Sequence, residues 1–173
     1  KGIARIINGS SDGWGAWANM GTEADEVERH PVISEEQPEW VMLTWAKPVE
    51  LDGLAALCCG FGAGDIQAYA GSADRHPRDA SEADWKTLAS PSGFESGYPS
   101  TLWPNVFLFE RAVTTRAVRF RITRTTPGDH PHIKNKPAGG RRIWLGELLA
   151  LRKIGSGALK LPAAAAAKTA PDE

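Results

Sequence analysis

The clearest pattern along this chain is an alternation of apolar and polar residues within positions 114–124, TTRAVRFRITR. Its apolar members are Val118, Phe120 and Ile122, and the polar positions beside them are Arg119, Arg121 and Thr123. Successive side chains of a strand point to opposite faces, whereas a helix repeats every 3.6 residues, so the segment predicts a β-strand with one face in the core. We expect its arginines to face solvent or to pair with neighbouring strands.

Further apolar runs predict the other strands, at residues 3–7, 39–45, 51–61, 66–70, 85–88, 106–109 and 143–154. The run 51–61 is almost continuously apolar, which is typical of a strand covered on both faces. Lys47-Pro48 is expected to end the strand before it, and residues 60–64 to form a turn after it. Ser81 is expected to cap a short helical turn. Short strands separated by such turns are typical of a β-sandwich or a β-barrel.

The balanced charge of the chain narrows the possible partners. The 173 residues include 20 Lys and Arg against 21 Asp and Glu, and the formal charge of −1 gives no general attraction to nucleic acid or anionic membranes. No apolar run approaches the roughly 20 residues of a membrane-spanning helix. There is no signal peptide, but the chain opens as an excised fragment would, so this absence says nothing about location.

The strand pattern stops at residue 154, which predicts one globular domain over residues 1–154. Residues 155–173 include LPAAAAAKTAPDE and are expected to form a linker or a tail. The only cysteines are the adjacent Cys58 and Cys59. Neighbours in a strand point to opposite faces, so we expect two buried thiols rather than a disulfide.

Motifs of catalysis are missing from the sequence. It contains no Gly-x-Ser-x-Gly elbow, phosphate-binding loop or zinc-type spacing, and its acidic residues are scattered through polar loops. His130 and His132 come closest to a metal motif, but two such loop histidines are expected to be solvent exposed. The seven tryptophans are more informative, because some of them lie in Gly-, Pro- or Ser-rich loops, where packing alone explains them less well.

Four segments, in order, resemble the discoidin-like domain, also called the coagulation factor type C domain. They are NGSSDGW (8–14), EWVMLTWAKPVELDGL (39–54), IQAYAGSAD with WKTLA (66–74 and 85–89), and TTRAVRFRIT with LGELLAL (114–123 and 145–151). The resemblance implies an all-β fold, an antiparallel jelly-roll sandwich of the galactose-binding-like type that binds ligands with loops at one end. Members bind glycans, phospholipid head groups or proteins, and most are not enzymes.

The resemblance also implies a structural calcium ion. In the family it is held by loop carbonyls, by an Asp of the first loop and by the Glu of the last strand. The matching positions here are Asn8, Asp12 and Glu147. Calcium takes six to eight oxygen ligands, although Asn8 stands where the family usually has Asp. The alternatives are an Asx turn at Asp12 and an ion pair of Glu147 with Arg116 or Arg142.

Galactose-binding members combine loop aromatics with a His and an Arg. By this resemblance the candidate ligand contacts are Trp17, Phe61, Trp103, Arg141 and Trp144. Aromatic rings stack on the C–H faces of sugars, but the His and the Arg are absent here, so galactose itself is not implied. The alternative for Trp17 and Trp103 is packing at the end of the sandwich.

We therefore expect a non-catalytic carbohydrate-binding module of a larger secreted or surface protein, in an extracellular, periplasmic or cell-surface location. Its expected partners are a glycan and the neighbouring domains of the parent chain. The alternative is a discoidin-type module that binds a protein or a membrane, which the near-neutral charge disfavours. A third possibility, an enzyme or an accessory domain, requires a cleft with paired, pKa-shifted groups.

Overall fold

The computed structural model describes residues 17–19, 29–94, 104–125 and 140–153. Within them, six antiparallel strands form a sheet in the order β1-β6-β2-β5-β3-β4. The strands are β1 (Trp17–Ala18), β2 (Glu39–Cys59), β3 (Phe61–Tyr69), β4 (Trp85–Ala89), β5 (Pro104–Thr125) and β6 (Trp144–Leu151). Two 3-10 turns, η3 (Pro77–Asp79) and η4 (Glu82–Asp84), precede β4. In this described part, no helix has the length and apolar character to cross a membrane.

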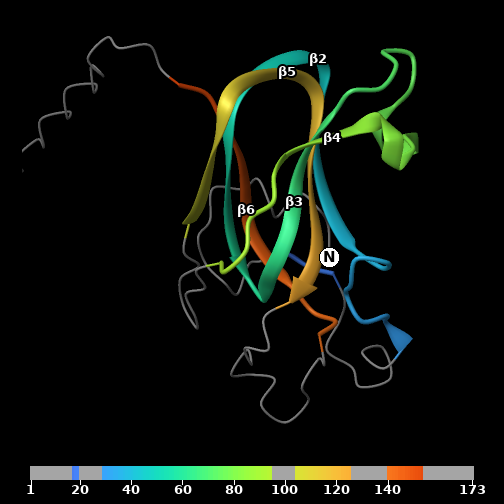
Figure 1. Cartoon of the computed structure of the whole chain (residues 1–173), viewed down its shortest axis with the longest axis vertical. Helices are drawn as coiled ribbons and strands as arrows, with labels where there is room; N and C mark the ends of the chain where they lie inside the picture. Colours follow the sequence, from blue (N-terminus) through green and yellow to red (C-terminus); the bar gives the residue numbers. More distant parts are fainter. Residues whose placement is uncertain (1–16, 20–28, 95–103, 126–139, 154–173) are drawn as a thin grey trace, which may run out of the picture.

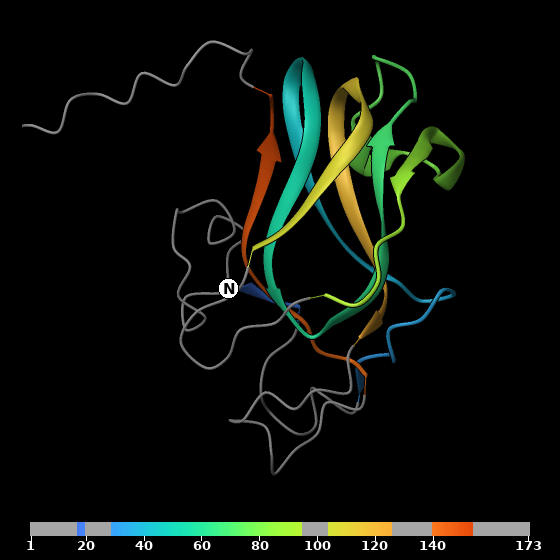
Figure 2. The same ribbon diagram turned by 60° about the vertical axis from the view of Figure 1, so that its left-hand side comes forward.

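The sheet becomes a sandwich because its two longest strands bend together. β2 and β5 are paired over almost their whole length, and both arch over the top of the molecule in Figure 1. Figure 2 shows the same arch from a second direction. The pairing shifts register between Thr44 and Val49 and again between Leu51 and Gly53. Such irregularities bend a strand and increase its twist, so the β2–β5 ribbon folds back on itself.

Two layers result from this fold. Layer A contains β4, β3, residues 117–125 of β5 and residues 39–44 of β2. Layer B contains residues 104–108 of β5, residues 53–59 of β2, β6 and β1. The all-β sandwich expected from the sequence is confirmed.

The core lies between the two layers. Val118, Phe120 and Ile122 are fully buried there, as the alternating pattern predicts, and they meet Leu54 and Leu148 of layer B. Burying a large aliphatic or aromatic side chain stabilises a fold by about 1.5–3 kcal/mol. The core therefore holds the two layers of the bent ribbon together.

On the outer face of layer A, Arg119 is buried rather than solvated. Only 5% of the residue is exposed, and its guanidinium carbon lies 4.3 Å from the centroid of the Trp85 ring. Its Nε donates to Oε1 of Gln67 at 2.7 Å, while Nη1 and Nη2 donate to the two carboxylate oxygens of Glu82. Arg119 thus pairs with neighbouring elements, which is one of the two outcomes expected from the sequence.

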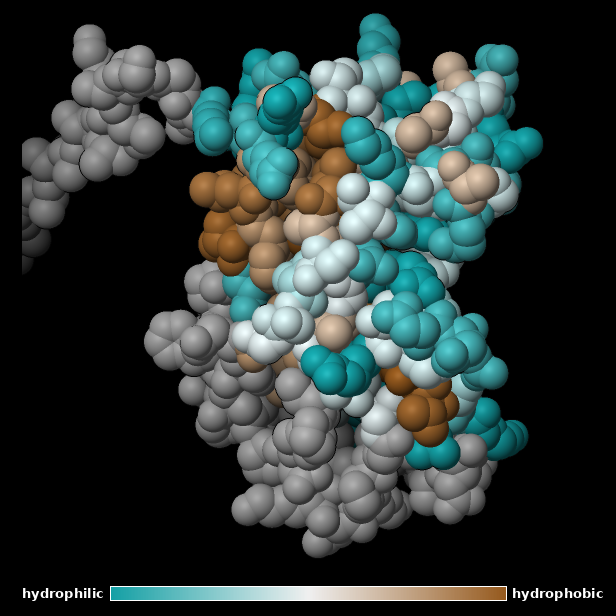
Figure 3. Space-filling model, viewed as in Figure 1, coloured by the Kyte–Doolittle hydropathy of each residue, from teal (hydrophilic) through white to brown (hydrophobic). Residues whose placement is uncertain are grey.

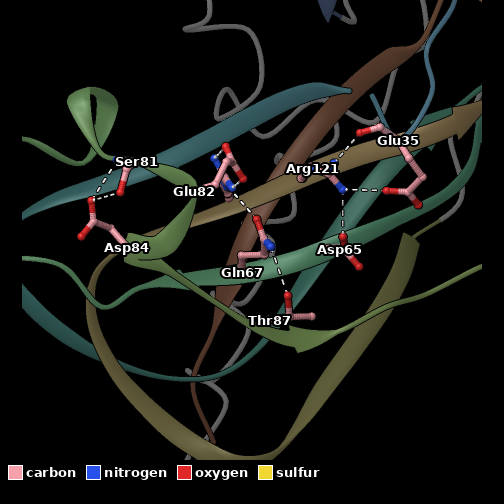
Figure 4. A network of polar contacts seen from close by, with 9 residues as sticks. Glu35, Asp65, Gln67, Ser81, Glu82, Asp84, Thr87 and Arg121 are labelled. Carbon is pink, nitrogen blue, oxygen red and sulfur yellow. Dashed lines mark hydrogen bonds and ion pairs between the residues drawn. The ribbon is translucent and has the colours of Figure 1, made fainter. Parts of the chain in front are cut away.

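Arg121 is held in a similar way, two residues along the same strand (Figure 4). Its Nη1 lies 3.0 Å from a carboxylate oxygen of Glu35 and 3.2 Å from one of Asp65. Asp65 also accepts from Oγ of Ser90 at 2.7 Å. Arg119 and Arg121 therefore stabilise layer A, which matches a scaffold role better than a ligand contact.

Three details differ from the sequence-based expectation. Lys47-Pro48 does not end a strand; it lies in the arch of β2, where a register shift absorbs the irregular residues. The separate strands expected at residues 106–109 and 114–124 are parts of the single strand β5. The turn expected over residues 60–64 is shorter, because β3 already begins at Phe61.

Two local expectations are confirmed. Ser81 is the N-cap of η4, and its backbone N–H and its hydroxyl both donate to Oδ2 of Asp84, at 2.9 and 2.8 Å. These bonds hold the pKa of the Asp84 carboxyl below its ordinary value. Cys58 and Cys59 are free and buried, and desolvation raises the pKa of the Cys58 thiol. The boundary between residues 154 and 155 lies outside the described residues.

Candidate functional site

One end of the sandwich, at the bottom of Figure 1, brings together the starts of β6 and β3 with β1. Trp144 of β6 lies opposite Ala18 of β1 on one side and opposite Cys59 of β2 on the other. Trp17 lies opposite Leu145. For Trp17 the structure describes the backbone alone, but the register is enough to place two candidate tryptophans on neighbouring strands at the same end.

Trp144 is the described candidate that keeps a partly exposed ring. It packs against Cys59 and Leu57 on the outer face of layer B, away from the main core. The guanidinium carbon of the buried Arg142 lies 5.6 Å from its ring centroid. This contact orients a large aromatic surface at the edge of the site.

Asn19 fixes the approach to β6, and sequence reasoning missed it. Its side-chain Nδ2 donates to the carbonyl of Arg141 at 2.8 Å, and its Oδ1 accepts from the backbone N–H of Ile143 at 3.1 Å. A carboxamide has a donor and an acceptor in one plane, as a peptide group does. The Asn19 side chain therefore makes the two hydrogen bonds to the backbone before β6 that a further residue of β1 would otherwise make. The sequence signal, an Asn two residues after a loop tryptophan, gives no hint of a partner 122 residues away.

Arg141 is tied to the segment that precedes β2. Its Nε donates to the carbonyl of His30 at 2.8 Å, and Nε2 of His30 lies 3.1 Å from a carboxylate oxygen of Glu39. The backbone N–H of Ile33 donates to the carbonyl of Gly140 at 3.0 Å. Residues 30–33 and 140–143 therefore form one connected surface beside Trp144.

The assignment of Phe61 as a ligand contact is wrong. The sequence placed it among ligand contacts at a loop, but it is 1% exposed and its ring packs edge-to-face on Phe94 and Phe120, with centroids 5.7 and 5.4 Å apart. Neither face of the ring is open to a sugar. The cause is the short turn: Gly60, with φ +85°, is its only residue, so Phe61 is already the first residue of β3 and points into the core.

The predicted metal ligands are only partly described. Glu147 lies in β6 opposite Leu57 and is 3% exposed, while Asn8 and Asp12 lie outside the described residues, as does Trp103. In the described part of the chain, no three His, Cys, Asp or Glu side chains gather as a metal site would require. Arg116, one alternative partner for Glu147, donates to the carbonyl of Ala73. Calcium therefore stays a prediction.

The end of the sandwich thus offers an aromatic platform with anchored arginines beside it. Such a surface suits a flat, hydroxyl-rich ligand, because C–H faces stack on the ring while guanidinium groups donate hydrogen bonds. The nearest thiol, Cys59, packs against Trp144 and is buried, and the neighbouring Cys58 is fully buried in the core, where burial keeps its thiol protonated.

Known structures share this architecture. No protein-family model matches the sequence, and no curated protein matches it either. A structure from work on the Streptococcus pneumoniae beta-galactosidase BgaA is similar with a TM-score of 0.59, at 11% identity over 88% of this chain and 82% of that chain. The module CBM32-1 of a family 31 glycoside hydrolase from Clostridium perfringens gives a TM-score of 0.50, at 8% identity over 86% and 83%.

The chain shares the sandwich fold of these two structures. The similarity covers most of both chains in each comparison, so it concerns the whole sandwich rather than one hairpin. At identities near 10% it establishes architecture alone, because one fold hosts many ligands. The ligand has to be argued from the residues at the end of the sandwich.

Proposed function

We propose that this chain is a non-catalytic carbohydrate-binding module that holds a glycan at the end of the sandwich formed by β1, β6 and the β2–β3 turn. The observation that carries the proposal is the partly exposed ring of Trp144, which is oriented by Arg142 and lies opposite Ala18, the residue after Trp17 in β1. Arg141 and Trp103 belong to the same proposed site, with Trp103 assigned from sequence alone. The similarity to CBM32-1 of a glycoside hydrolase supports this ligand class.

The test is a glycan array with the whole chain, followed by titration of the best glycan. We expect Trp144→Ala to weaken binding at least about fivefold, because stacking of the ring on the C–H face of a sugar is worth on the order of 1 kcal/mol or more. Trp144→Phe keeps an aromatic face and should retain most of the affinity. Trp40→Ala is the matched control, because Trp40 is an exposed tryptophan on layer A.

Three outcomes contradict the proposal. The first is that the array shows no binding to any glycan. The second is that Trp144→Ala binds as the parent chain does. The third is that Trp40→Ala loses affinity equally. Binding to vesicles or to a protein in place of glycans favours the discoidin-type interaction module instead.

Calcium belongs to the same proposal as a structural ion near Glu147. What supports it is a carboxylate buried at 3% exposure in β6, a position where a cation offsets the cost of burying charge. We expect calcium, but not magnesium, to raise the midpoint of thermal unfolding, and Glu147→Gln to remove that shift. A calcium shift that survives Glu147→Gln places the ion elsewhere.

We also place the module in a larger secreted or surface protein, joined to neighbouring domains through residues 155–173. The composition of that segment supports a linker, since it combines Gly, Ser, Pro and an Ala run. Limited proteolysis of a longer natural chain tests this placement. We expect cleavage within residues 155–173 to release a folded module that keeps its glycan affinity.

A further inference from the structure

The outer face of layer B and the end of the sandwich differ in character. Three aliphatic side chains are exposed on the outer face: Val106, Leu108 and Leu149. Figure 3 shows the corresponding apolar area on the upper left of the molecule, over β5 and β6. At the end of the sandwich, hydrogen bonds join residues 30–33 to residues 140–143. The side chain of Arg141 takes part in these bonds, so its orientation depends on the polar groups around it.

His30 connects Arg141 to the other layer of the sandwich. Its carbonyl oxygen accepts from Nε of Arg141 at 2.8 Å, and Nε2 of its ring lies 3.1 Å from a carboxylate oxygen of Glu39. Glu39 opens β2 in layer A, opposite Ile122 of β5, whereas Arg141 leads into β6 of layer B. The contacts therefore run from layer A through His30 to Arg141.

The backbone around Arg141 is held by other groups. Its carbonyl accepts from Nδ2 of Asn19 at 2.8 Å, and the carbonyl of the preceding Gly140 accepts from the N–H of Ile33 at 3.0 Å. A guanidinium group is planar, so a hydrogen bond at Nε restricts the direction in which its other nitrogens point. The carbonyl of His30 thus orients the side chain of a residue whose backbone is already fixed.

Both ring nitrogens of His30 face oxygen acceptors. Nδ1 lies 3.2 Å from the carbonyl oxygen of Pro31, and Nε2 faces the carboxylate of Glu39. A neutral imidazole carries one N–H and serves only one of these two oxygens, whereas the imidazolium form donates to both. The side chains of His30 and Glu39 are 22% and 26% exposed, so the pair keeps some access to water. The charged form of His30 therefore satisfies both acceptors at once.

We propose that His30 is a positioning residue of the glycan site, and that its protonated form holds Arg141 in the orientation that binds the glycan. This inference rests on the proposed function of that site. Protonation lets the ring donate to Pro31 and Glu39 together, which immobilises the backbone at His30, and the carbonyl of His30 is the acceptor for Arg141. Glycan affinity should therefore rise as the pH falls from about 8 to about 5.5, the range in which imidazoles change charge.

Four described residues bring charge to the surroundings of His30: Arg29, Glu39, Arg124 and Arg141. Arg124 follows Ile122, the β5 partner of Glu39, by two positions and so shares its face of the strand. The arginines oppose a further positive charge, but Arg141 contacts the backbone carbonyl, whereas Glu39 contacts the ring itself. Because Coulomb energy falls with distance, Glu39 decides the sign of the effect. A partly exposed ion pair of this kind should change affinity by about two- to fivefold.

Titration of the whole chain with the best-binding neutral oligosaccharide of the array, between about pH 5.5 and about pH 8, tests the proposal. A neutral ligand is chosen because its own charge does not change over this range. We expect the affinity of the parent chain to be about two- to fivefold higher at the acid end. His30→Gln should bind equally at both ends, with about the affinity that the parent chain has at the alkaline end. Glu39→Gln should reduce the pH dependence as well, because it removes the carboxylate that favours the charged ring.

The other histidines of the chain supply the controls. His76 lies in the segment before β4, where its Nδ1 accepts from the backbone N–H of Arg78 at 3.1 Å. His76→Gln should therefore keep the parental pH profile. His130 and His132 lie outside the described residues, and the double variant His130→Gln, His132→Gln should keep that profile too.

A measurement without glycan separates this inference from the proposed function. NMR gives the rate of hydrogen exchange at Nε–H of Arg141 relative to the rate at Nε–H of Arg119, which donates to Gln67 in layer A. The intrinsic pH dependence of exchange is common to both groups and cancels in this ratio. We expect the ratio to rise several-fold from about pH 5.5 to about pH 8 in the parent chain, and to stay constant in His30→Gln.

Three results would each overturn the proposal. The first is a glycan affinity that stays constant or falls toward acid pH. The second is a pH dependence that survives unchanged in His30→Gln, and the third is a pH dependence that disappears in the double variant of His130 and His132. If the array yields no ligand, the proposed function fails, and the exchange ratio still decides whether protonated His30 holds Arg141: a constant ratio in the parent chain shows that it does not.

Discussion

Gly60→Ala gives the sharpest test of how the β2–β3 turn positions the site. Gly60 has φ +85°, in the left-handed region that L side chains avoid, and a Cβ built there lies 2.9 Å from the carbonyl oxygen of Arg142. Gly93 has φ +71° with no atom within 4 Å of its Cβ position. The two glycines therefore share the backbone strain but differ in the contact.

The expected magnitudes follow from that difference. Left-handed strain costs about 1–2 kcal/mol, and the smaller conformational freedom of alanine in the unfolded chain returns about 0.4–1 kcal/mol, so Gly93→Ala should destabilise by roughly 1 kcal/mol or less. Gly60→Ala must also displace the backbone of Arg142, which brings the total to about 2–3 kcal/mol. At about 2–4 °C per kcal/mol, the midpoint should fall by roughly 4–12 °C.

Calorimetry and urea denaturation measure both variants, and glycan titration follows at a temperature where both are folded. We expect Gly60→Ala alone to weaken glycan binding as well, since Arg142 and Trp144 adjoin the displaced backbone. Equal destabilisation by the two variants would falsify the claim that close packing against Arg142 demands glycine at position 60.

Three further predictions concern other parts of the molecule. The hydrogen bond from Arg119 lowers the pKa of the exposed Glu82 carboxyl below its ordinary value of 4.5. The contribution of Glu82 to stability is therefore complete above that pH and is lost as pH falls through the lower, folded value, and Glu82→Gln should flatten this acid limb of a denaturation-versus-pH series. Phe61→Ala should cost about 3–5 kcal/mol in the free energy of unfolding, while folded Phe61→Leu should bind glycan with unchanged affinity. Asn19→Ala should lower the free energy of unfolding by about 1–3 kcal/mol and weaken glycan binding, because it removes the two hydrogen bonds of the carboxamide to the backbone of Arg141 and Ile143. A variant as stable as the parent chain would contradict this role of Asn19.

Strand positions were predictable where one face of a strand is buried. The alternation of residues 114–124 correctly places Val118, Phe120 and Ile122 in the core, because a half-buried strand imposes a period of two on the sequence. The arch was not predictable. Residues 45–50 of β2 read as a strand end, since Lys47-Pro48 cannot maintain a regular ladder, yet the partner strand bends with them and the pairing resumes.

The sequence indicated the end of the sandwich at which the candidate residues lie, but it was less successful in identifying the individual residues there. Trp144 and Trp17 lie on paired strands at one end, although the sequence placed Trp17 in a loop. Phe61 was misassigned because a Phe-Gly-Ala-Gly stretch reads as a loop, whereas tertiary packing on Phe94 and Phe120 extends the strand to its first residue. Asn19 had no local signal, because its partners come from the far end of the chain.

The shared arch of β2 and β5 limits the order in which the strands of this domain can pair during folding. β5 pairs with β2 in both layers and with β3 in layer A, and it begins at residue 104. Glu39 of β2 pairs with Ile122 of β5, which is far along the chain. During synthesis, the long apolar run of β2 is therefore made well before its partner strand is available. Such distant pairings slow folding and leave β2 exposed to misassociation in the interval. In the folded domain, β2 and β5 pair with each other in both layers and so link them. The sandwich should therefore unfold as a single cooperative unit rather than one layer at a time.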